Sequence, residues 1–282
     1  MPNALELVNL TKHYPGFTLD HLSFSLPSGC IMGFIGENGA GKSTTLKLIL
    51  DLVKRDEGTI RVLGQDADSN LKDIKEHLGV VMDESGFPDH LTALDIGQIC
   101  RRSYRTWNGQ AFSNYVKKFE LPTKKMVKAL SRGMKMKLSI AVALSHDSRL
   151  LILDEATSGL DPIVRDEILD EFLDFIQDEG HSVLISSHII SDLEKICDYI
   201  TFIHKGRLVF SQGKDELLET YGLVKCGQDE LHALPPQAVV GVRRNSFGAE
   251  ALARREAIPR GYALDNPTLE EIMLYFVKEE RP

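Results

Sequence analysis

Residues 36–44 read Gly36-Glu37-Asn38-Gly39-Ala40-Gly41-Lys42-Ser43-Thr44, which is a complete phosphate-binding loop of the form G-x-x-x-x-G-K-S. The apolar run from Cys30 to Ile35 before the loop predicts a buried strand. Behind the loop, apolar residues recur at helical spacing and predict a helix with one apolar face, made of Leu46, Ile49, Leu50 and Val53. The loop therefore lies between a strand and a helix, which is the context that the motif requires.

The chemistry of this loop points to a nucleotide. Small residues let the backbone fold around phosphates, and its N–H groups then point inward at a helix N-terminus, where negative charge is favoured. Lys42 would reach the β- and γ-phosphates, and the hydroxyl of Ser43 would bind Mg²⁺. The sequence thus predicts a nucleotide-binding protein.

The chain as a whole has 282 residues and a net charge of -8, a length that allows one large or two modest domains. The acidic balance argues against a nucleic-acid partner. No run of 18 apolar residues occurs, so we expect no membrane span, and residues 1–6 lack the features of an export signal. The scattered cysteines form no C-x-x-C pair and predict reduced thiols in a cytoplasmic protein: Cys30, Cys100, Cys197 and Cys226.

Alternation of apolar and polar residues predicts an antiparallel pair of half-buried strands before the loop. Leu5, Leu7 and Leu10 mark the first strand, and Leu22, Phe24 and Leu26 mark the second. Tyr14 lies in the turn between them. Short strands are also expected at residues 57–62 and 78–82.

From about residue 88 to 146 the pattern is helical, with breaks at residues 107–109 and 121–122. Buried strands return at residues 150–153 and 183–185, and residues 199–210 predict a hairpin. Between those strands Asp161-Pro162 predicts a helix start, with Asp161 as the N-cap. We therefore expect a parallel α/β core in residues 1–218, with an antiparallel β subdomain and a helical insertion at about 88–146.

Residues 219–282 are expected to form a small C-terminal accessory module. Its signals are weak because Pro and Gly interrupt short apolar runs. Pro267-Thr268-Leu269-Glu270-Glu271 predicts a capping box that opens a last helix. The apolar face of that helix would consist of Leu269, Ile272, Met273 and Phe276.

A second chemical motif is the apolar strand at residues 150–153, which ends in the carboxylates Asp154 and Glu155. In a phosphate-loop protein this is where Mg²⁺ and the attacking water are handled. We expect Asp154 to accept hydrogen bonds from the water shell of Mg²⁺. Glu155 would polarise the water that attacks the γ-phosphate.

Several motifs together resemble those of the ATP-binding cassette (ABC) proteins, in that family's order. Leu130-Ser131-Arg132-Gly133-Met134 resembles the LSGGQ signature and lies about twenty residues before the Asp-Glu pair. Ser158-Gly159-Leu160-Asp161 resembles the D-loop, and His188 resembles the switch histidine. The resemblance covers roughly residues 3 to 215 and implies a P-loop NTPase fold of the RecA-like type.

The resemblance also assigns roles. It implies that Tyr14 stacks on adenine and that His188 joins Glu155 in catalysis. Ser131 is placed to cap the following helix, so its hydroxyl, the Gly133 N–H and the helix dipole would form a second anion site. Two phosphate sites on one chain suit a head-to-tail dimer in which each ATP lies between the phosphate loop of one chain and the signature of the other.

Two of the motifs depart from the family pattern. Where the family usually has a glutamine, this chain has Asp83 followed by Glu84, and either could be the equivalent residue. A carboxylate there would bind Mg²⁺ more strongly but would add negative charge beside the γ-phosphate. In the signature, Arg132 and Met134 replace the usual Gly and Gln, while Ser131 and Gly133 remain.

By this resemblance the chain is expected to be the ATPase subunit of an ABC transporter with ATP and Mg²⁺ as cofactors. It would form a homodimer, or a heterodimer with a second ATPase subunit, on the inner face of the membrane and drive separate permease subunits. It looks most like the bacterial exporter branch that handles drugs, peptides or lipids. The alternatives are an importer ATPase and a soluble ABC ATPase without a transport role.

Overall fold

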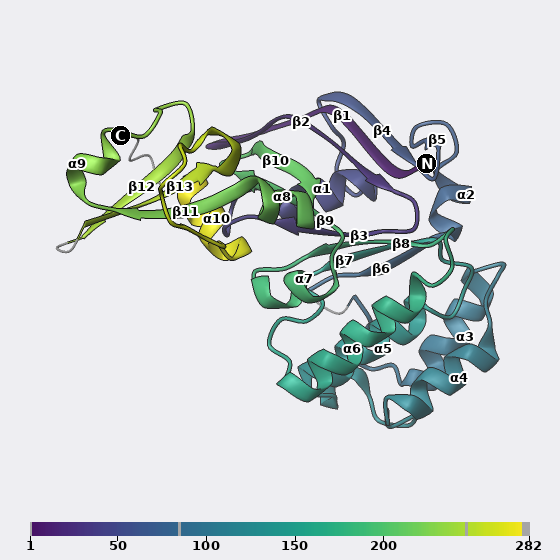
Figure 1. Cartoon of the computed structure of the whole chain (residues 1–282). Coiled ribbons are helices and arrows are strands. Elements are labelled where there is room, and N and C mark those ends of the chain that lie inside the picture. Colours follow the sequence, from purple (N-terminus) through teal and green to yellow (C-terminus); the bar gives the residue numbers. More distant parts are fainter. Residues whose placement is uncertain (1, 84–85, 246–247, 278–282) are drawn as a thin grey trace. The chain divides into compact units, whose positions relative to one another are not determined.

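The computed structural model describes residues 2–83, 86–245 and 248–277. The chain divides into two compact units, and the boundary along the chain lies between Leu208 and Val209. This boundary falls inside a strand, whereas the sequence pattern placed it after residue 218. The two units are described separately (Figure 1).

A six-stranded sheet forms the centre of the first unit, with the strand order β10-β9-β3-β8-β7-β6. Neighbouring strands from β9 to β6 are parallel, as expected for an α/β core. The strands that form the middle of this sheet are buried along their whole length, which explains their continuous apolar sequences. The sheet consists of β3 (Ile31–Ile35), β6 (Leu78–Val81), β7 (Leu150–Asp154), β8 (Ser182–Ser186), β9 (Tyr199–His204) and β10 (Arg207–Gly213).

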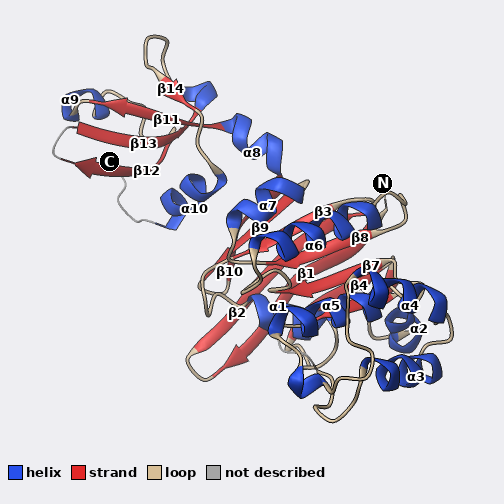
Figure 2. Ribbon diagram, turned by 90° about the horizontal axis from the view of Figure 1, so that it is seen from below, coloured by secondary structure: helices blue, strands red, loops and turns tan. Residues whose placement is uncertain are grey.

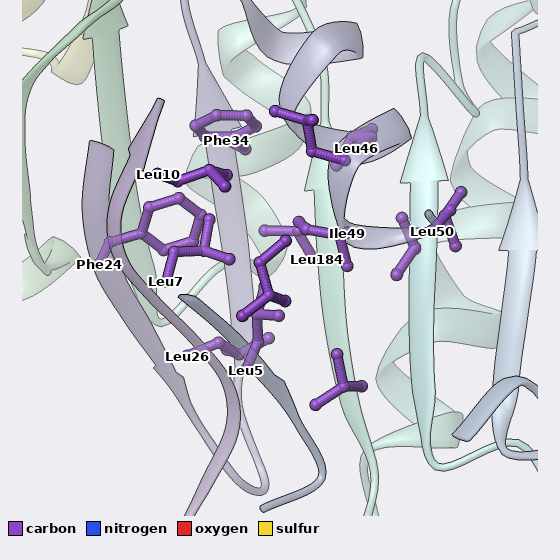
Figure 3. Packing of buried hydrophobic residues seen from close by; sticks show 14 of the residues in the cluster. Leu5, Leu7, Leu10, Phe24, Leu26, Phe34, Leu46, Ile49, Leu50 and Leu184 are labelled. Carbon is purple, nitrogen blue, oxygen red and sulfur yellow. The ribbon is translucent and has the colours of Figure 1, made fainter. Parts of the chain in front are cut away.

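A second, antiparallel sheet has the order β2-β1-β4-β5 and confirms the predicted strand pair. Leu7 lies opposite Phe24, and Leu10 lies opposite Leu22. Figure 3 shows Leu7, Leu10 and Phe24 in one cluster with Leu46 and Ile49 from the helix after the phosphate-binding loop and with Leu184 of β8, and Leu22 belongs to the same cluster. The strands are β1 (Asn3–Tyr14), β2 (Phe17–Pro27), β4 (Glu57–Val62) and β5 (Gln65–Asp66).

The helix that follows the loop is α1 (Lys42–Ile49), shorter than the sequence pattern predicted. Asp51 adopts a left-handed conformation, with φ of 53°. The N–H of Leu52 bonds to the carbonyl of Lys47, and the N–H of Asp51 bonds to that of Leu48, which is the Schellman arrangement that ends helices. Val53 therefore lies beyond the helix, and its expected place on the helix face was wrong; it still packs against the core.

Helices between β6 and β7 form the predicted insertion. They are α3 (Ala93–Ser103), α4 (Gly109–Lys118), the 3₁₀ turn η1 (Val127–Ala129) and α5 (Arg132–Ala143). Polar side chains cap the three α-helices: Thr92 caps α3, Asn108 caps α4 and Ser131 caps α5. In Figure 2 α3 and α4 lie side by side, away from β2.

The remaining helices of the first unit are α2 (Leu71–Glu76), α6 (Pro162–Phe175) and α7 (Ile190–Ile196). Asp161 accepts a hydrogen bond from the N–H of Val164, and Pro162 occupies the first turn, so the predicted start of α6 is confirmed. None of the helices in the described ranges is long and apolar enough to cross a membrane.

The second unit contains a four-stranded sheet with the order β12-β13-β11-β14. Thr268 and Glu271 form the predicted capping box at the start of the last helix. Within this unit, which begins at Val209, Phe276 of that helix contacts Phe210 and Tyr221. The elements are α8 (Lys214–Thr220), β11 (Tyr221–Cys226), α9 (Gln228–Leu231), β12 (Val239–Asn245), β13 (Gly248–Arg254), η2 (Arg255–Ala257), β14 (Leu264–Asp265) and α10 (Leu269–Val277).

Candidate nucleotide site

The phosphate-binding loop runs from the carboxyl end of β3 to the first turn of α1, as the sequence predicted. Gly41 is the N-cap residue of α1 and has φ of 113°, a conformation that only glycine adopts easily. A Cβ on Gly36 would lie 2.7 Å from the carbonyl oxygen of Ile203 on β9, so a side chain would not fit there. These two glycines let the loop turn tightly against the sheet and leave the first N–H groups of α1 directed into the loop.

Lys42 is buried, and its Nζ donates hydrogen bonds to the carbonyl oxygens of Gly36 at 2.6 Å and Glu37 at 3.3 Å. Burial lowers the pKa of the Lys42 ammonium group, and the nearby carboxylates of Glu155 and Asp154 oppose this shift. The loop therefore holds a cation inside its own turn. An incoming phosphate would replace carbonyl oxygens as the partner of that cation.

A cavity of about 590 Å³ opens at the loop and brings together most of the predicted site. It is lined by Gly16, Phe17, Glu37, Asn38, Gly39, Gly41, Lys42, Ser43, Thr44, Asp83, Asp154 and Glu155. Gly36 and Ala40 lie in the loop and shape it. Glu84, the alternative to Asp83, lies outside the described residues.

The aromatic residue at the cavity is Phe17. Tyr14 pairs with Phe17 across the β1–β2 turn and is 39% exposed, and the Nζ of Lys12 lies 5.8 Å from the centre of its ring. The sequence analysis missed Phe17 and Gly16, although both lie in the same turn as Tyr14. Phe17 therefore lies at the cavity wall, whereas Tyr14 is not among the lining residues.

Asp154 and Glu155 end β7 beside the end of β8, because Asp154 pairs with Ser186 in the parallel sheet. Asp154 is buried and accepts a hydrogen bond from the Ser186 hydroxyl at 2.5 Å. Glu155 has φ of 53°, which turns the chain sharply after the strand, and its N–H bonds to the carbonyl of Ser186. The sequence analysis did not identify Ser186, which orients the buried carboxylate.

His188 follows β8 and reaches the same carboxylate pair. Its Nδ1 donates to Oε2 of Glu155 at 2.6 Å. The two predicted catalytic side chains are therefore in direct contact. A second histidine, His204 at the end of β9, lies 3.1 Å from the carboxylate of Glu37 in the loop and was not predicted.

The signature residues lie at the start of α5. The Ser131 hydroxyl accepts a hydrogen bond from the N–H of Met134 at 3.2 Å, so Ser131 is the N-cap. Gly133 lies against Leu160: a Cβ on Gly133 would be 3.4 Å from Cδ2 of Leu160. Among the described residues of this chain, Ser131 and Gly133 are not part of the cavity lining that contains Lys42.

The donor set suits a hard divalent cation. Asp154 is a buried carboxylate that accepts a hydrogen bond from the Ser186 hydroxyl and lies near the charge of Lys42. Carboxylate and hydroxyl oxygens are the ligands that a hard divalent cation prefers, and Asp154 and Ser43 supply both at this cavity. The described residues contain no group of three or more His, Cys, Asp or Glu side chains placed to hold a metal, and Mg²⁺ is normally held by one or two carboxylates together with substrate phosphates.

A phosphate-binding loop with a buried lysine, followed on the neighbouring strands by an acidic pair and a histidine, defines a nucleoside-triphosphatase of the P-loop class. The family model described as ABC transporter matches residues 19–158. The bacitracin transport ATP-binding protein BcrA of Bacillus licheniformis is 36% identical over 212 residues, which cover 74% of this chain and 69% of that protein. The lantibiotic transport ATP-binding protein SrtF of Streptococcus pyogenes is 35% identical over 217 residues, which cover 75% of this chain and 91% of that protein.

A solved structure described as the ATP-binding subunit of an ABC transporter superimposes with a TM-score of 0.70 at 25% identity, covering 76% of this chain and 91% of that one. The chain therefore belongs to the ABC transporter family, as an ATP-binding ATPase. The expected fold class is confirmed.

Proposed function

We propose that this chain is the ATP-hydrolysing subunit of an exporter for a peptide-like or lipid-like substrate, working through separate membrane subunits. The observation that carries the catalytic part is the contact between Glu155 and His188 beside the cavity that contains Lys42. The names of the bacitracin and lantibiotic transport relatives support a peptide-like substrate, and the direction of transport is part of the proposal.

In this proposal the phosphates of ATP lie in the loop from Gly36 to Thr44, with Lys42 at the β- and γ-phosphates. The hydroxyl of Ser43 and the carboxylates of Asp154 and Asp83 would hold Mg²⁺, which neutralises phosphate charge when bound. Glu155 orients the attacking water and accepts its proton, and His188 holds that carboxylate in place. Tyr14, together with Phe17, provides an aromatic surface for adenine.

Ser131 and Gly133 are proposed to contact the ATP of a second chain. The support is that they do not line the cavity of their own chain, while the start of α5 offers free N–H groups to an anion. The second chain would be another copy or a related ATPase subunit.

The permease is the proposed membrane partner, and it would hold the ATPase on the inner face of the membrane. The segment from Asp83 to Phe87 and the helical insertion would transmit movement to it. Co-purification with the permease encoded by a neighbouring gene, followed by uptake of substrate into inside-out vesicles on addition of ATP, tests this directly. Requirement for a substrate-binding protein would instead favour an importer, and activity without any permease would favour a soluble ABC ATPase.

The nucleotide assignment is tested by Lys42→Ala, compared with Lys47→Ala. Lys47 is an exposed lysine on the same helix. Loss of the buried point charge on the phosphates should weaken ATP binding at least about tenfold and abolish hydrolysis, whereas Lys47→Ala should keep both. Unchanged ATP affinity and hydrolysis in Lys42→Ala would remove the site assignment.

A further inference from the structure

Two of the residues at which this chain departs from the usual family pattern, Asp83 and Arg132, are in contact. Nη2 of Arg132 donates to Oδ1 of Asp83 at 2.5 Å, and the two side chains are 53% and 48% exposed. Asp83 follows β6, and Arg132 is the first residue of α5, 49 residues further along the chain. The fold thus brings an acidic residue at the glutamine position together with a basic residue at a glycine position.

The contact between Arg132 and Asp83 affects the net charge of the cavity in which ATP is proposed to bind. Of the described residues that line it, Lys42 is the cation, and four are carboxylates: Glu37, Asp83, Asp154 and Glu155. Triphosphate is strongly anionic, so every unpaired carboxylate at the cavity opposes its binding. Glu37 lies beside His204, and Glu155 accepts a hydrogen bond from His188. Asp83 has a permanently charged partner, because an arginine remains protonated at any working pH.

The position of Arg132 depends on a third motif. Gly159, in the segment that resembles the D-loop, has φ of 69°, and a Cβ there would lie 3.2 Å from Nη1 of Arg132. The guanidinium therefore lies against backbone that carries no side chain, within reach of Asp83.

We propose that Arg132 is the counter-ion of Asp83 within the same chain, and that it offsets the carboxylate which replaces a neutral residue at the edge of the phosphate site. The proposal rests on ATP binding in this cavity. Arg132 is a positioning residue in this scheme: its effect on the nucleotide passes through Asp83.

The test is a mutant cycle of the parent protein, Arg132→Gln, Asp83→Asn and the double variant, with ATP affinity measured by calorimetry. EDTA removes free divalent metal, so that metal binding by Asp83 does not contribute to the measured ATP affinity. Sedimentation at the same protein concentration identifies a monomer, so that any effect arises within one chain. Adenosine serves as the uncharged ligand.

The matched control is Arg105→Gln. Arg105 pairs with Asp73 at 2.6 Å, with exposures of 65% and 50%, and neither residue lines the cavity. This variant removes a comparable exposed ion pair elsewhere in the same unit. Thermal unfolding checks that each variant remains folded.

Arg132→Gln should weaken ATP binding about threefold to tenfold, because one partly screened charge beside the phosphates becomes unpaired. Asp83→Asn should restore the affinity of Arg132→Gln to at least the parent value. Adenosine binding and the affinity of Arg105→Gln should not change.

Parent-like ATP affinity in Arg132→Gln would overturn the inference. So would an equal loss from Arg132→Gln in the parent protein and in the Asp83→Asn variant, because Arg132 would then act on the nucleotide independently of Asp83. Failure of the parent protein to bind ATP would refute the nucleotide site itself, which separates the two proposals.

Discussion

At the scale of single residues, the buried end of β7 depends on a neighbouring hydroxyl. Ser186 donates to Asp154 at 2.5 Å, and hydrogen bonds to charged groups contribute about 1.5–3 kcal/mol. Ser186→Ala should therefore lower the rate of hydrolysis about tenfold to a hundredfold and shift its Mg²⁺ dependence, because Asp154 loses its orientation.

Ser182→Ala is the control for that variant. Ser182 is buried at the other end of the same strand, where its hydroxyl accepts a hydrogen bond from the N–H of Gly29. The Ser182→Ala variant should be less stable than the parent but should keep the parent hydrolysis rate and Mg²⁺ titration. A parent-like Mg²⁺ titration in Ser186→Ala would show that Ser186 is only a packing residue.

The position of the loop between a strand and a helix could be predicted, because the motif and the apolar patterns that flank it lie in one short stretch. Ser186 and Phe17 could not be predicted in the same way, because their roles depend on which strands and turns become neighbours. The pairing of Asp83 with Arg132 is a still clearer case: each residue looked like an isolated departure, and only the fold shows that they meet. Contacts between distant segments are set by tertiary packing, which local patterns do not contain.

At the scale of elements, local signals and structure agree where a cap or a clear period marks the boundary. Asp161 starts α6 and Ser131 starts α5, as their sequences predicted. The predicted end of α1 was wrong because Asp51 adopts a left-handed conformation. This conformation is uncommon outside glycine and gives no strong sequence signal. The strands of the second unit were not predicted, since short apolar runs interrupted by Gly and Pro are ambiguous without their partners.

The capping box of α10 allows a test at this scale. Thr268 accepts from the N–H of Glu271 at 3.2 Å, and Glu271 accepts from the N–H of Thr268 at 2.7 Å. Thr268→Ala should lower the free energy of unfolding of the second unit by about 1 kcal/mol. Glu270→Ala, an exposed change in the same turn, should cost less than about 0.5 kcal/mol in chemical denaturation followed by circular dichroism. Equal losses for both variants would contradict a specific role of the cap.

At the scale of the whole molecule, the two proposed anion sites of one chain are built on different elements. Lys42 and Glu155 belong to the cavity at the edge of the parallel sheet, whereas Ser131 and Gly133 belong to the start of α5 in the helical insertion. Neither site alone encloses a nucleotide in this proposal. Head-to-tail pairing of two chains would bring a site of each kind to every ATP, so turnover and assembly should be coupled.

That coupling makes Glu155→Gln the most informative variant. A group that orients and deprotonates the attacking water contributes about 10²–10⁴ in rate, or about 3–5 kcal/mol of barrier, so hydrolysis should nearly stop. Glutamine keeps the side-chain volume, and removal of one negative charge from the cavity should strengthen ATP binding.

The variant should therefore accumulate as an ATP-bound dimer. Ser131→Arg added to it should return it to monomer, while Glu167→Gln, at an exposed carboxylate that pairs with Lys137, should behave like the parent. Size-exclusion chromatography with Mg-ATP and a hydrolysis assay measure both properties. A Glu155→Gln monomer with parent activity would contradict both the catalytic role and the dimer, whereas an inactive monomer would contradict only self-assembly of the isolated subunit.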